Sequence, residues 1–172
     1  MILSGHKIIE EVKNGKIVIS PFNKENVTTN SYDVCLGDTL IRYTDKIIDP
    51  KKMPNFEVIK IPKDGFLIKK NEFFLGSTVE EIGSEHYVPL LHAKSGTARS
   101  GLFVHITADL IDIGSVGNLT LQIYATLPVI VYPHMKIAQV SFWVPKGRII
   151  LYNGKYQHSK GPQISKTSID FK

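Results

Sequence analysis

Short apolar runs alternate with turn residues along most of the chain. The runs are rich in Ile, Val, Phe and Leu, and Gly, Pro, Asn or Asp residues bound them, a pattern typical of β-strands. Many short strands at this spacing favour a mainly β fold, either a barrel or a sandwich. The expected strands cover residues 16–19, 56–61, 66–68, 72–75, 88–91, 102–106, 119–125, 129–131 and 137–144.

One helix is predicted near the start of the chain. Ser4 can cap its first turn. Ile8, Ile9 and Val12 share one face at helical spacing. Asn14-Gly15 supplies a left-handed stop, so the helix should run for about three turns.

The composition favours one domain that spans residues 1–172. The 172 residues are 42% hydrophobic and 22% charged, a balance that excludes a disordered chain. No apolar run approaches the ~18 residues of a membrane-spanning helix, and the N-terminus does not resemble a signal peptide. The single cysteine, Cys35, excludes an internal disulfide. We therefore expect a soluble protein in a reducing, cytoplasmic compartment, without a membrane partner.

Basic residues outnumber acidic ones. Lys and Arg number 21, Asp and Glu number 16, and the net charge is +5, which favours anionic partners, either nucleic acids or small phosphates. The aromatic residues do not form a stacking platform on consecutive exposed strand positions, which argues against nucleic acid. The six histidines lack metal-ligand spacing, so we assign no zinc site.

A first candidate site is the turn at residues 93–101. Ser95 and Gly96 can open a helical turn, formed by residues 97–99, whose N–H groups point at an anion. The Ser95 hydroxyl and the cations of Lys94 and Arg99 would complete a cradle for phosphate oxygens. An ordinary capped surface turn also fits these residues, and local chemistry alone favours it.

Two carboxylates three residues apart mark a second candidate site. Asp109 and Asp112 follow an apolar strand, and one of them could orient a water or take its proton during attack on phosphorus. Both could equally accept backbone hydrogen bonds in a turn, which Asp often does. Spacing alone does not decide between the two interpretations.

The strand at residues 119–125 provides a third candidate. Its alternation places Leu119, Leu121, Ile123 and Ala125 on one face and Thr120, Gln122 and Tyr124 on the other. The Gln122 amide carries both a donor and an acceptor, so it could hold the edge of a base. Alternatively, Gln122 is an exposed glutamine on a strand and has no functional role.

The polar tail, residues 152–172, is the fourth candidate. Tyr152, Lys155, Tyr156 and Gln157 interleave aromatic, cationic and amide groups. Tyrosine can stack or donate a hydrogen bond while lysine neutralises phosphate, which suits a flexible C-terminal lid over a nucleotide. A disordered basic tail is the alternative.

Together these segments resemble the dCTP deaminase/dUTPase family, and the bifunctional members most closely, over nearly the whole chain. Five blocks occur in the order of the family. They are residues 2–4 with 30–37, residues 94–102, residues 104–108 with 111–112, residues 132–133 with 137–139, and residues 154–157.

The resemblance implies a distorted, dUTPase-like β-barrel that assembles as a homotrimer with active sites at subunit interfaces. It also implies that dUTP or dCTP binds with Mg²⁺, and that the metal is held through the triphosphate and water, without a direct protein ligand. Whether thymidine nucleotides such as dTTP inhibit is left open. No nucleic acid partner is implied.

The resemblance also assigns roles by motif position. Asp112 should meet the deoxyribose 3′-hydroxyl and activate the attacking water. The candidate catalytic residues are Asp112, Gln122, Ser95 and Arg99. Lys94, which stands where the family usually has arginine, and Gly96 should contact the phosphates. The main chain of Ile106, Thr107 and Ala108 should contact the pyrimidine. The tail residues that should close over the triphosphate are Tyr152, Lys155, Tyr156 and Gln157.

Gln122 departs from the deaminating members of the family, which have a glutamate at this position. That glutamate moves protons between the attacking water, ring N3 and the departing ammonia, and glutamine cannot carry a proton. Loss of a positioned acid–base group costs about 10² to 10⁴ in rate, so deamination should be severely impaired. The sequence leaves open whether Gln122 is natural or replaces a glutamate.

The sequence therefore predicts a trimeric, Mg²⁺-dependent dUTP diphosphatase that forms dUMP and pyrophosphate with a water oriented by Asp112. The alternatives are dCTP deamination, alone or coupled to this hydrolysis, and a non-catalytic nucleotide sensor.

Three departures from the family bear on affinity and base choice. Asp109 replaces a glycine or histidine, Ser115 an aromatic residue and Ser159 a glutamine.

Overall fold

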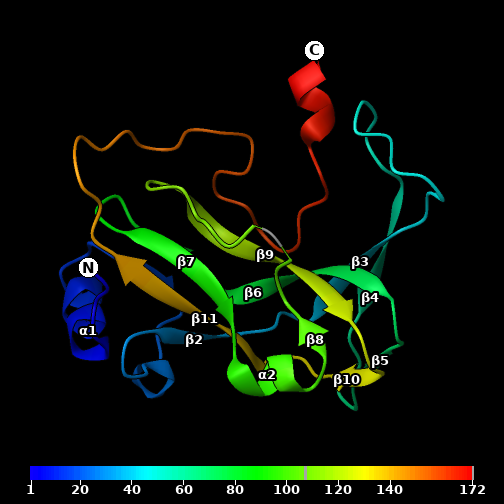
Figure 1. Ribbon diagram of the computed structural model, residues 1–172, viewed down its shortest axis with the longest axis horizontal. Helices are drawn as coiled ribbons and strands as arrows, with labels where there is room; N and C mark the ends of the chain where they lie inside the picture. The colour runs from blue at the N-terminus through cyan, green and yellow to red at the C-terminus, as the bar shows by residue number, and fades with distance from the viewer. Residues whose placement is uncertain (107, 172) are drawn as a thin grey trace.

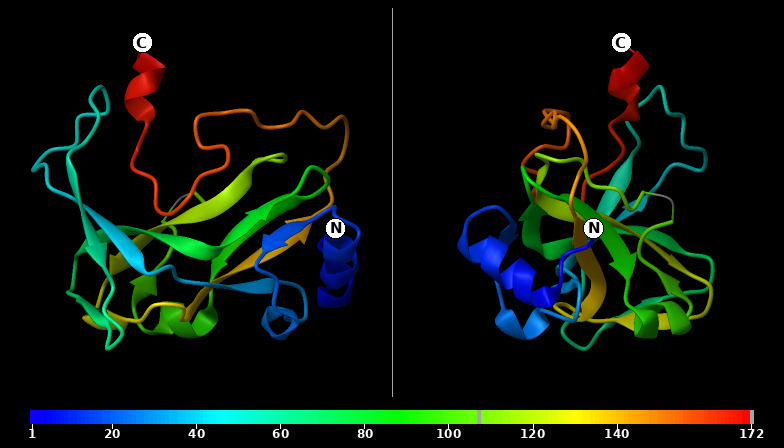
Figure 2. Two further views of the ribbon diagram at one scale, coloured as in Figure 1. Left: turned by 180° about the vertical axis from the view of Figure 1, so that it is seen from behind. Right: turned by 60° about the vertical axis from the view of Figure 1, so that its left-hand side comes forward.

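Three antiparallel β-sheets form the framework of the computed structural model, which describes residues 1–106 and 108–171 (Figures 1 and 2). The elements in chain order are α1 (Gly5–Lys13), β1 (Val18–Ser20), η1 (Lys24–Asn26), β2 (Tyr32–Cys35), β3 (Thr39–Tyr43), β4 (Phe56–Lys60), β5 (Phe66–Ile68), β6 (Phe73–Gly83), β7 (Val88–Ala93), α2 (Ser95–Arg99), β8 (Leu102–Phe103), β9 (Val116–Ala125), β10 (Val129–Val131), β11 (Lys136–Trp143) and η2 (Thr167–Phe171).

The long strands β6 and β9 form the centre of the largest sheet. Its strand order is β4-β3-β6-β9-β8, and β1 pairs with the C-terminal end of β6. A second sheet has the order β2-β11-β7, and β10 pairs with β5. The pairing of β6 with β9 shifts register between Ser77 and Glu81. Such a bulge bends a strand, and here it lies beside the start of β9.

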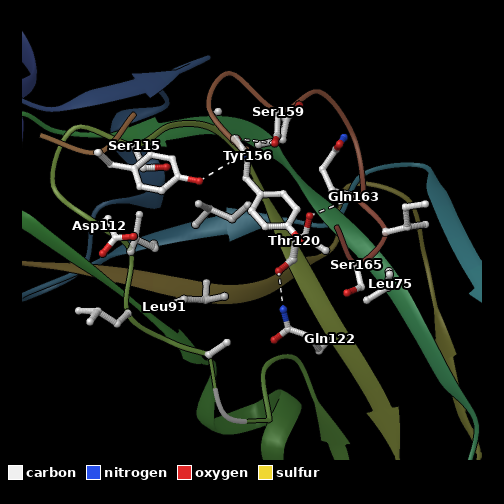
Figure 3. A pocket seen from close by; sticks show the side chains of 18 of the residues that line it. Leu75, Leu91, Asp112, Ser115, Thr120, Gln122, Tyr156, Ser159, Gln163 and Ser165 are labelled. Atoms are coloured by element: carbon white, nitrogen blue, oxygen red, sulfur yellow. Dashed lines mark hydrogen bonds between the residues drawn. The ribbon is translucent and has the colours of Figure 1, made fainter. Parts of the chain in front are cut away.

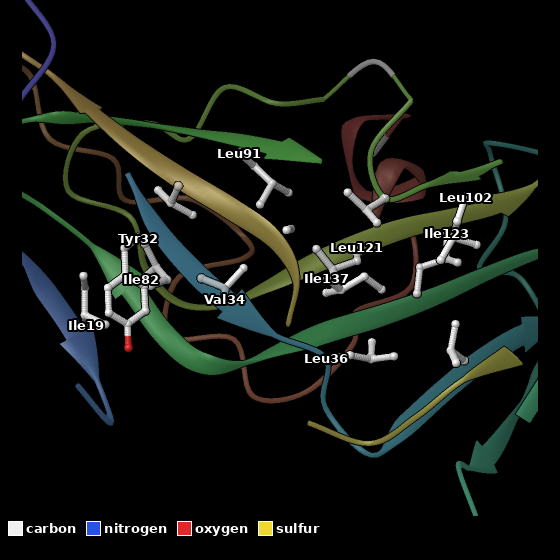
Figure 4. Packing of buried hydrophobic residues seen from close by; sticks show 14 of the residues in the cluster. Ile19, Tyr32, Val34, Leu36, Ile82, Leu91, Leu102, Leu121, Ile123 and Ile137 are labelled. Atoms are coloured by element: carbon white, nitrogen blue, oxygen red, sulfur yellow. The ribbon is translucent and has the colours of Figure 1, made fainter. Parts of the chain in front are cut away.

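The hydrophobic core lies between the sheets (Figure 4). Leu121 and Ile123 of β9 are fully buried, as are Val34 of β2 and Ile137 of β11. Because β9 alternates, its opposite face is left for Thr120, Gln122 and Tyr124, which are half-buried. The predicted two-faced strand is confirmed.

The predicted N-terminal helix is confirmed at both ends. The Ser4 hydroxyl accepts a hydrogen bond from the Lys7 N–H at 3.4 Å, and the helix ends before Asn14 and a left-handed Gly15 with φ of 70°. Among the described residues, no helix has the length and apolar character that crossing a membrane requires.

Two parts of the strand prediction need correction. Among the described residues the strands form three sheets and no closed barrel, so the mainly β prediction is confirmed while the barrel closure is not found. The strands β2 and β3 were not predicted, and β6 continues to Gly83 where residues 72–75 were expected. Asp33 and Arg42 interrupt the apolar pattern of β2 and β3, and Gly76, Ser77 and Thr78 interrupt that of β6.

The Glu11 carboxylate joins α1 to the segment that follows it. Its side chain is only 1% exposed, with Lys7 Nζ 2.9 Å from Oε1 and Lys16 Nζ 3.6 Å from Oε2. The hydrogen bond from the Lys7 ammonium is the main reason that the pKa of Glu11 falls from 4.5 to about 2. The folded state therefore favours the ionised form of this group.

Replacing Glu11 by glutamine should lower the midpoint of thermal unfolding at neutral pH, because the amide loses both ion pairs. A group whose pKa is lower in the folded state stabilises the protein at pH values above its unfolded-state pKa. This stabilisation is lost as the pH falls through its folded-state pKa. The difference from wild type should therefore shrink between about pH 4.5 and pH 2. Thermal unfolding followed by circular dichroism measures it. Glu10→Gln, at the exposed neighbour that also pairs with Lys7, should change the midpoint less, and a pH-independent difference would contradict the prediction.

Candidate active site

A pocket of about 500 Å³ lies along the polar face of β9 (Figure 3). Its walls come from β3, β6, β7 and β9, from the loop at residues 108–115 and from the tail, residues 152–165. The structure brings five of the predicted site residues to this pocket, from three separate parts of the chain. They are Ala108, Asp112, Gln122, Tyr152 and Tyr156.

Asp112 is presented by a turn that the backbone itself closes. The Ser115 N–H donates to the Asp112 carbonyl oxygen at 3.0 Å, and the Gly114 N–H donates to the Ser84 carbonyl oxygen at 2.7 Å. Gly114 has a φ of 91°, and a Cβ there would lie 2.9 Å from the Tyr152 nitrogen. The turn is thus fixed between β6 and the tail, and it leaves the carboxylate of Asp112 exposed on the pocket wall.

The structure separates the two predicted carboxylates. The Asp109 carbonyl accepts a hydrogen bond from the Leu91 N–H at 2.9 Å, which fixes the loop to β7. Asp109 also lies near His92, whose pKa is lowered by burial and by His105, while the charge of Asp109 acts in the opposite direction. Among the described residues that line the pocket, Asp112 is the only acidic one.

The Gln122 amide enters the pocket with an unsatisfied acceptor. Its Nε2 donates to the Thr120 carbonyl oxygen at 3.3 Å, whereas Oε1 is buried and has no hydrogen-bond partner among the described residues. A buried acceptor without a partner costs about 1–3 kcal/mol. A ligand that offers a donor to Oε1 would recover this cost.

Only part of the predicted pyrimidine-reading segment can be placed. Ala108 lines the pocket, and the Ile106 side chain is exposed. Thr107 lies outside the described residues. Contact between this main chain and a base stays a prediction.

The predicted phosphate cradle lies outside this pocket. Residues 95–99 form the helical turn α2, where residues 97–99 were predicted to be helical. Ser95, Gly96 and Arg99 are exposed, and none of the described residues that line the pocket belongs to α2. Lys94 Nζ lies 2.5 Å from Oδ2 of the buried Asp33. To contact a phosphate, Lys94 would have to leave this ion pair.

The predicted tail residues fix the tail to the Asp112 turn. The Tyr152 N–H donates to the Ile113 carbonyl oxygen at 2.8 Å, and the Tyr152 hydroxyl accepts from the Tyr156 N–H at 3.1 Å. Gln157 Oε1 accepts from the Val116 N–H at 2.9 Å, and its Nε2 donates to the Gly114 carbonyl oxygen at 2.7 Å. Gln157 therefore binds protein backbone with both ends of its amide, and its contact with a triphosphate stays a prediction.

Lys155 is paired within the tail. Its Nζ lies 2.7 and 2.6 Å from the two carboxylate oxygens of Asp170 and 5.9 Å from the centre of the Tyr156 ring. The Lys155 side chain is 26% exposed. A triphosphate that recruits this cation would therefore have to replace Asp170.

Sequence reasoning missed several residues that line the pocket. Gln163 and Ser165 return to it from the end of the tail, and Tyr43 reaches it from β3. Neither the polar tail nor the interrupted strand carries a periodic apolar pattern, so no local signal pointed to these residues. The alternation of β9 was the available signal for Thr120, the neighbour of Gln122 on the polar face.

Known sequences related to this chain carry a consistent description. The sequence model of the dCTP deaminase-like family matches residues 2–144. Three proteins named dCTP deaminase, dUMP-forming, are similar to the chain over 99% of its length and 99% of theirs. They come from Clostridium beijerinckii, Clostridium botulinum and Cytophaga hutchinsonii, at 41%, 39% and 38% identity.

A solved structure supports the fold. The 2′-deoxycytidine 5′-triphosphate deaminase from Agrobacterium tumefaciens matches 84% of this chain with a TM-score of 0.68, and the match spans 48% of that longer chain. Because the two sequences are only 19% identical, the similarity between the two structures supports a shared fold and nothing further. The match of the family model and the full-length similarity to the relatives establish the predicted family. This chain belongs to the dCTP deaminase-like family.

Proposed function

We propose that this chain forms dUMP from a deoxypyrimidine nucleoside triphosphate, by hydrolysis at the α-phosphorus of dUTP. The observation that carries the proposal is that the Asp112 carboxylate and the Gln122 amide line one pocket, which the tail borders. One group can accept a proton, and the other can hold a base without titrating. The relatives are named as dUMP-forming enzymes, which supports dUMP as the product.

The chemistry follows from what each wall of the pocket offers. Phe73, Leu75 and Leu91 supply apolar surface for a pyrimidine ring. Asp112 is exposed at the pocket wall, where its carboxylate accepts a proton from the attacking water. The water oxygen then bonds to the α-phosphorus as the bond to the β-phosphate oxygen breaks, and pyrophosphate leaves.

The proposed site draws its phosphate cradle from a neighbouring copy of the chain. Ser95 and Arg99 are exposed on α2, outside the pocket that contains Asp112. A homotrimer with active sites at subunit interfaces, which the family resemblance implies, would bring α2 of one copy to the pocket of the next. Both halves of the site are then present in the assembly.

Mg²⁺ is part of the proposed reaction. The donors that suit it are oxygens, which the triphosphate and water would supply without a direct protein ligand. When bound, Mg²⁺ would neutralise the charge that develops on the phosphates. The residues of this chain would orient the nucleotide and take the proton.

A second candidate function is the full conversion of dCTP to dUMP. The relatives favour it over hydrolysis of dUTP alone, because they are named as dCTP deaminases. The Gln122 amide argues against it, because replacing cytosine N4 by oxygen requires a group that moves protons on the ring, and an amide does not titrate. The identity of the side chain at residue 122 therefore separates the two candidates.

Asp112→Asn should reduce pyrophosphate release from dUTP by about 10² to 10⁴, because the amide cannot accept the proton of the attacking water. Binding of a fluorescent dUTP analogue and the thermal midpoint should change little, since the turn is closed by the backbone of Asp112. Asp109→Asn is the matched control and should retain most of the activity. Wild-type protein that binds dUTP without releasing pyrophosphate would instead be a nucleotide sensor.

Gln122→Glu should raise ammonia release from dCTP by about 10² or more, because it restores a titratable oxygen at the half-buried polar face of β9. Hydrolysis of dUTP by the same variant should remain within a few-fold of wild type. Ammonia and pyrophosphate are measured with each substrate in the presence of Mg²⁺. If the wild-type protein already deaminates dCTP as fast as it cleaves dUTP, the second candidate function is correct.

Co-expressing the Arg99→Ala and Asp112→Asn chains should restore activity that neither variant has alone. In trimers that contain both chains, about one site in three would combine an intact Asp112 with an intact Arg99 from the neighbouring copy. Steady-state pyrophosphate release from differently tagged, doubly purified complexes measures this fraction. Complexes that contain both chains and remain inactive would place the whole site within one chain.

A further inference from the structure

Polar side chains on β9 hold the tail at regular intervals. Asn118 Oδ1 accepts a hydrogen bond from the Gly161 N–H at 3.0 Å. Two residues further on, Thr120 Oγ1 accepts from the Gln163 N–H at 3.0 Å (Figure 3). Both contacts come from the same face of the strand and advance by two residues in β9 and in the tail. We call this pair of contacts the tail ladder.

The first contact of the ladder is fixed in advance by β6. Asn118 Nδ2 donates to the carbonyl oxygens of Val79 and Glu80, at 3.1 and 3.2 Å, within the register shift of that strand. These two bonds orient the amide so that Oδ1 faces the tail. The Asn118 N–H also donates to the Ser159 carbonyl oxygen at 2.9 Å, so backbone and side chain hold the same stretch.

The ladder stops before Gln122. Continued spacing would bring residue 165 to Gln122, the next polar position of β9. The Ser165 N–H instead donates to the Tyr43 hydroxyl of β3 at 2.9 Å, and the buried Oε1 of Gln122 has no hydrogen-bond partner among the described residues. The tail therefore crosses from β9 to β3 at this point, and Gln163, Ile164 and Ser165 become pocket wall.

We propose that Asn118 and Thr120 are positioning residues, which hold the tail as a wall of the nucleotide pocket and set the point at which it leaves β9. Their effect on turnover rests on the proposed function, whereas their hold on the tail does not. Because Asp112 is fixed through its own turn and through Gln157, loss of the ladder should weaken nucleotide binding and spare the chemical step.

Thr120→Val is the sharpest test, because it keeps the shape of the side chain and removes the hydroxyl acceptor. Without nucleotide, hydrogen exchange at the Gln163 amide should become about 2- to 10-fold faster, as expected for the loss of one partly buried hydrogen bond. With dUTP and Mg²⁺, KM should rise by a similar factor while kcat stays within about 2-fold. Thr120→Ser, which retains a hydroxyl, should restore both values.

Two further variants separate the ladder from general effects on the strand. Tyr124→Phe removes a hydroxyl from the same face of β9, where it contacts Asn71, and should leave exchange at Gln163 unchanged. Gly117→Ala places a Cβ 2.7 Å from the Ser159 nitrogen and 2.9 Å from its carbonyl oxygen, so it should displace the tail from a different position and also raise KM.

Unchanged exchange at Gln163 in Thr120→Val would overturn the proposal, as would a fall in kcat at constant KM. If wild-type protein fails to turn over dUTP, the proposed function fails. The exchange measurement then still decides the ladder, because it needs no nucleotide. Faster exchange in Thr120→Val, restored in Thr120→Ser, supports the positioning role in either case.

Discussion

The strict alternation of β9 is the constraint on which the rest of the molecule depends. Leu121, Ile123 and Ala125 are fully buried in the core, so the intervening side chains must face the other way. That second face supplies Gln122 to the pocket and Thr120 to the tail. A one-residue slip of the strand would bury the polar groups and expose the apolar ones. Core packing therefore fixes the chemistry of the pocket as well as the fold.

Features that are local in sequence could be predicted, and features that join distant segments could not. The capped helix, the two faces of β9 and the turn α2 follow from periodicity and from residues such as Ser4. The strand β2 pairs with β11, far along the chain, and β3 lies between β4 and β6 in the largest sheet. The end of the tail is placed by partners on β3 and β9. The composition of the tail predicts that it is polar but does not indicate which tail residue lies beside which strand residue. The contribution of Gln163 and Ser165 to the pocket wall could therefore not be predicted.

Two lysines that the family resemblance expects to contact phosphate form ion pairs with carboxylates of the same chain. Lys94 lies against Asp33, and Lys155 lies against Asp170. The pairs differ in kind, because Asp33 is buried whereas the Asp170 side chain is 61% exposed. Exposed pairs contribute little to stability, so a triphosphate can displace Asp170 at small cost. Removing Lys94 would leave the buried Asp33 without its closest counter-ion, which favours an orienting role for that lysine at the start of α2.

Glu80, unlike Glu11, is a buried carboxyl group with no ion pair among the described residues. It is 3% exposed, and burial raises its pKa although the Cys35 N–H donates to it. The Gln122 side-chain oxygen is buried, so a carboxyl at residue 122 would also be desolvated, and a raised pKa suits a group that must accept and release protons in turn. Gln122 stands in that environment without the ability to titrate. It retains an acceptor and lacks the proton that ring chemistry requires, whereas the proposed cleavage of the triphosphate would rest on the exposed Asp112, which this difference leaves in place.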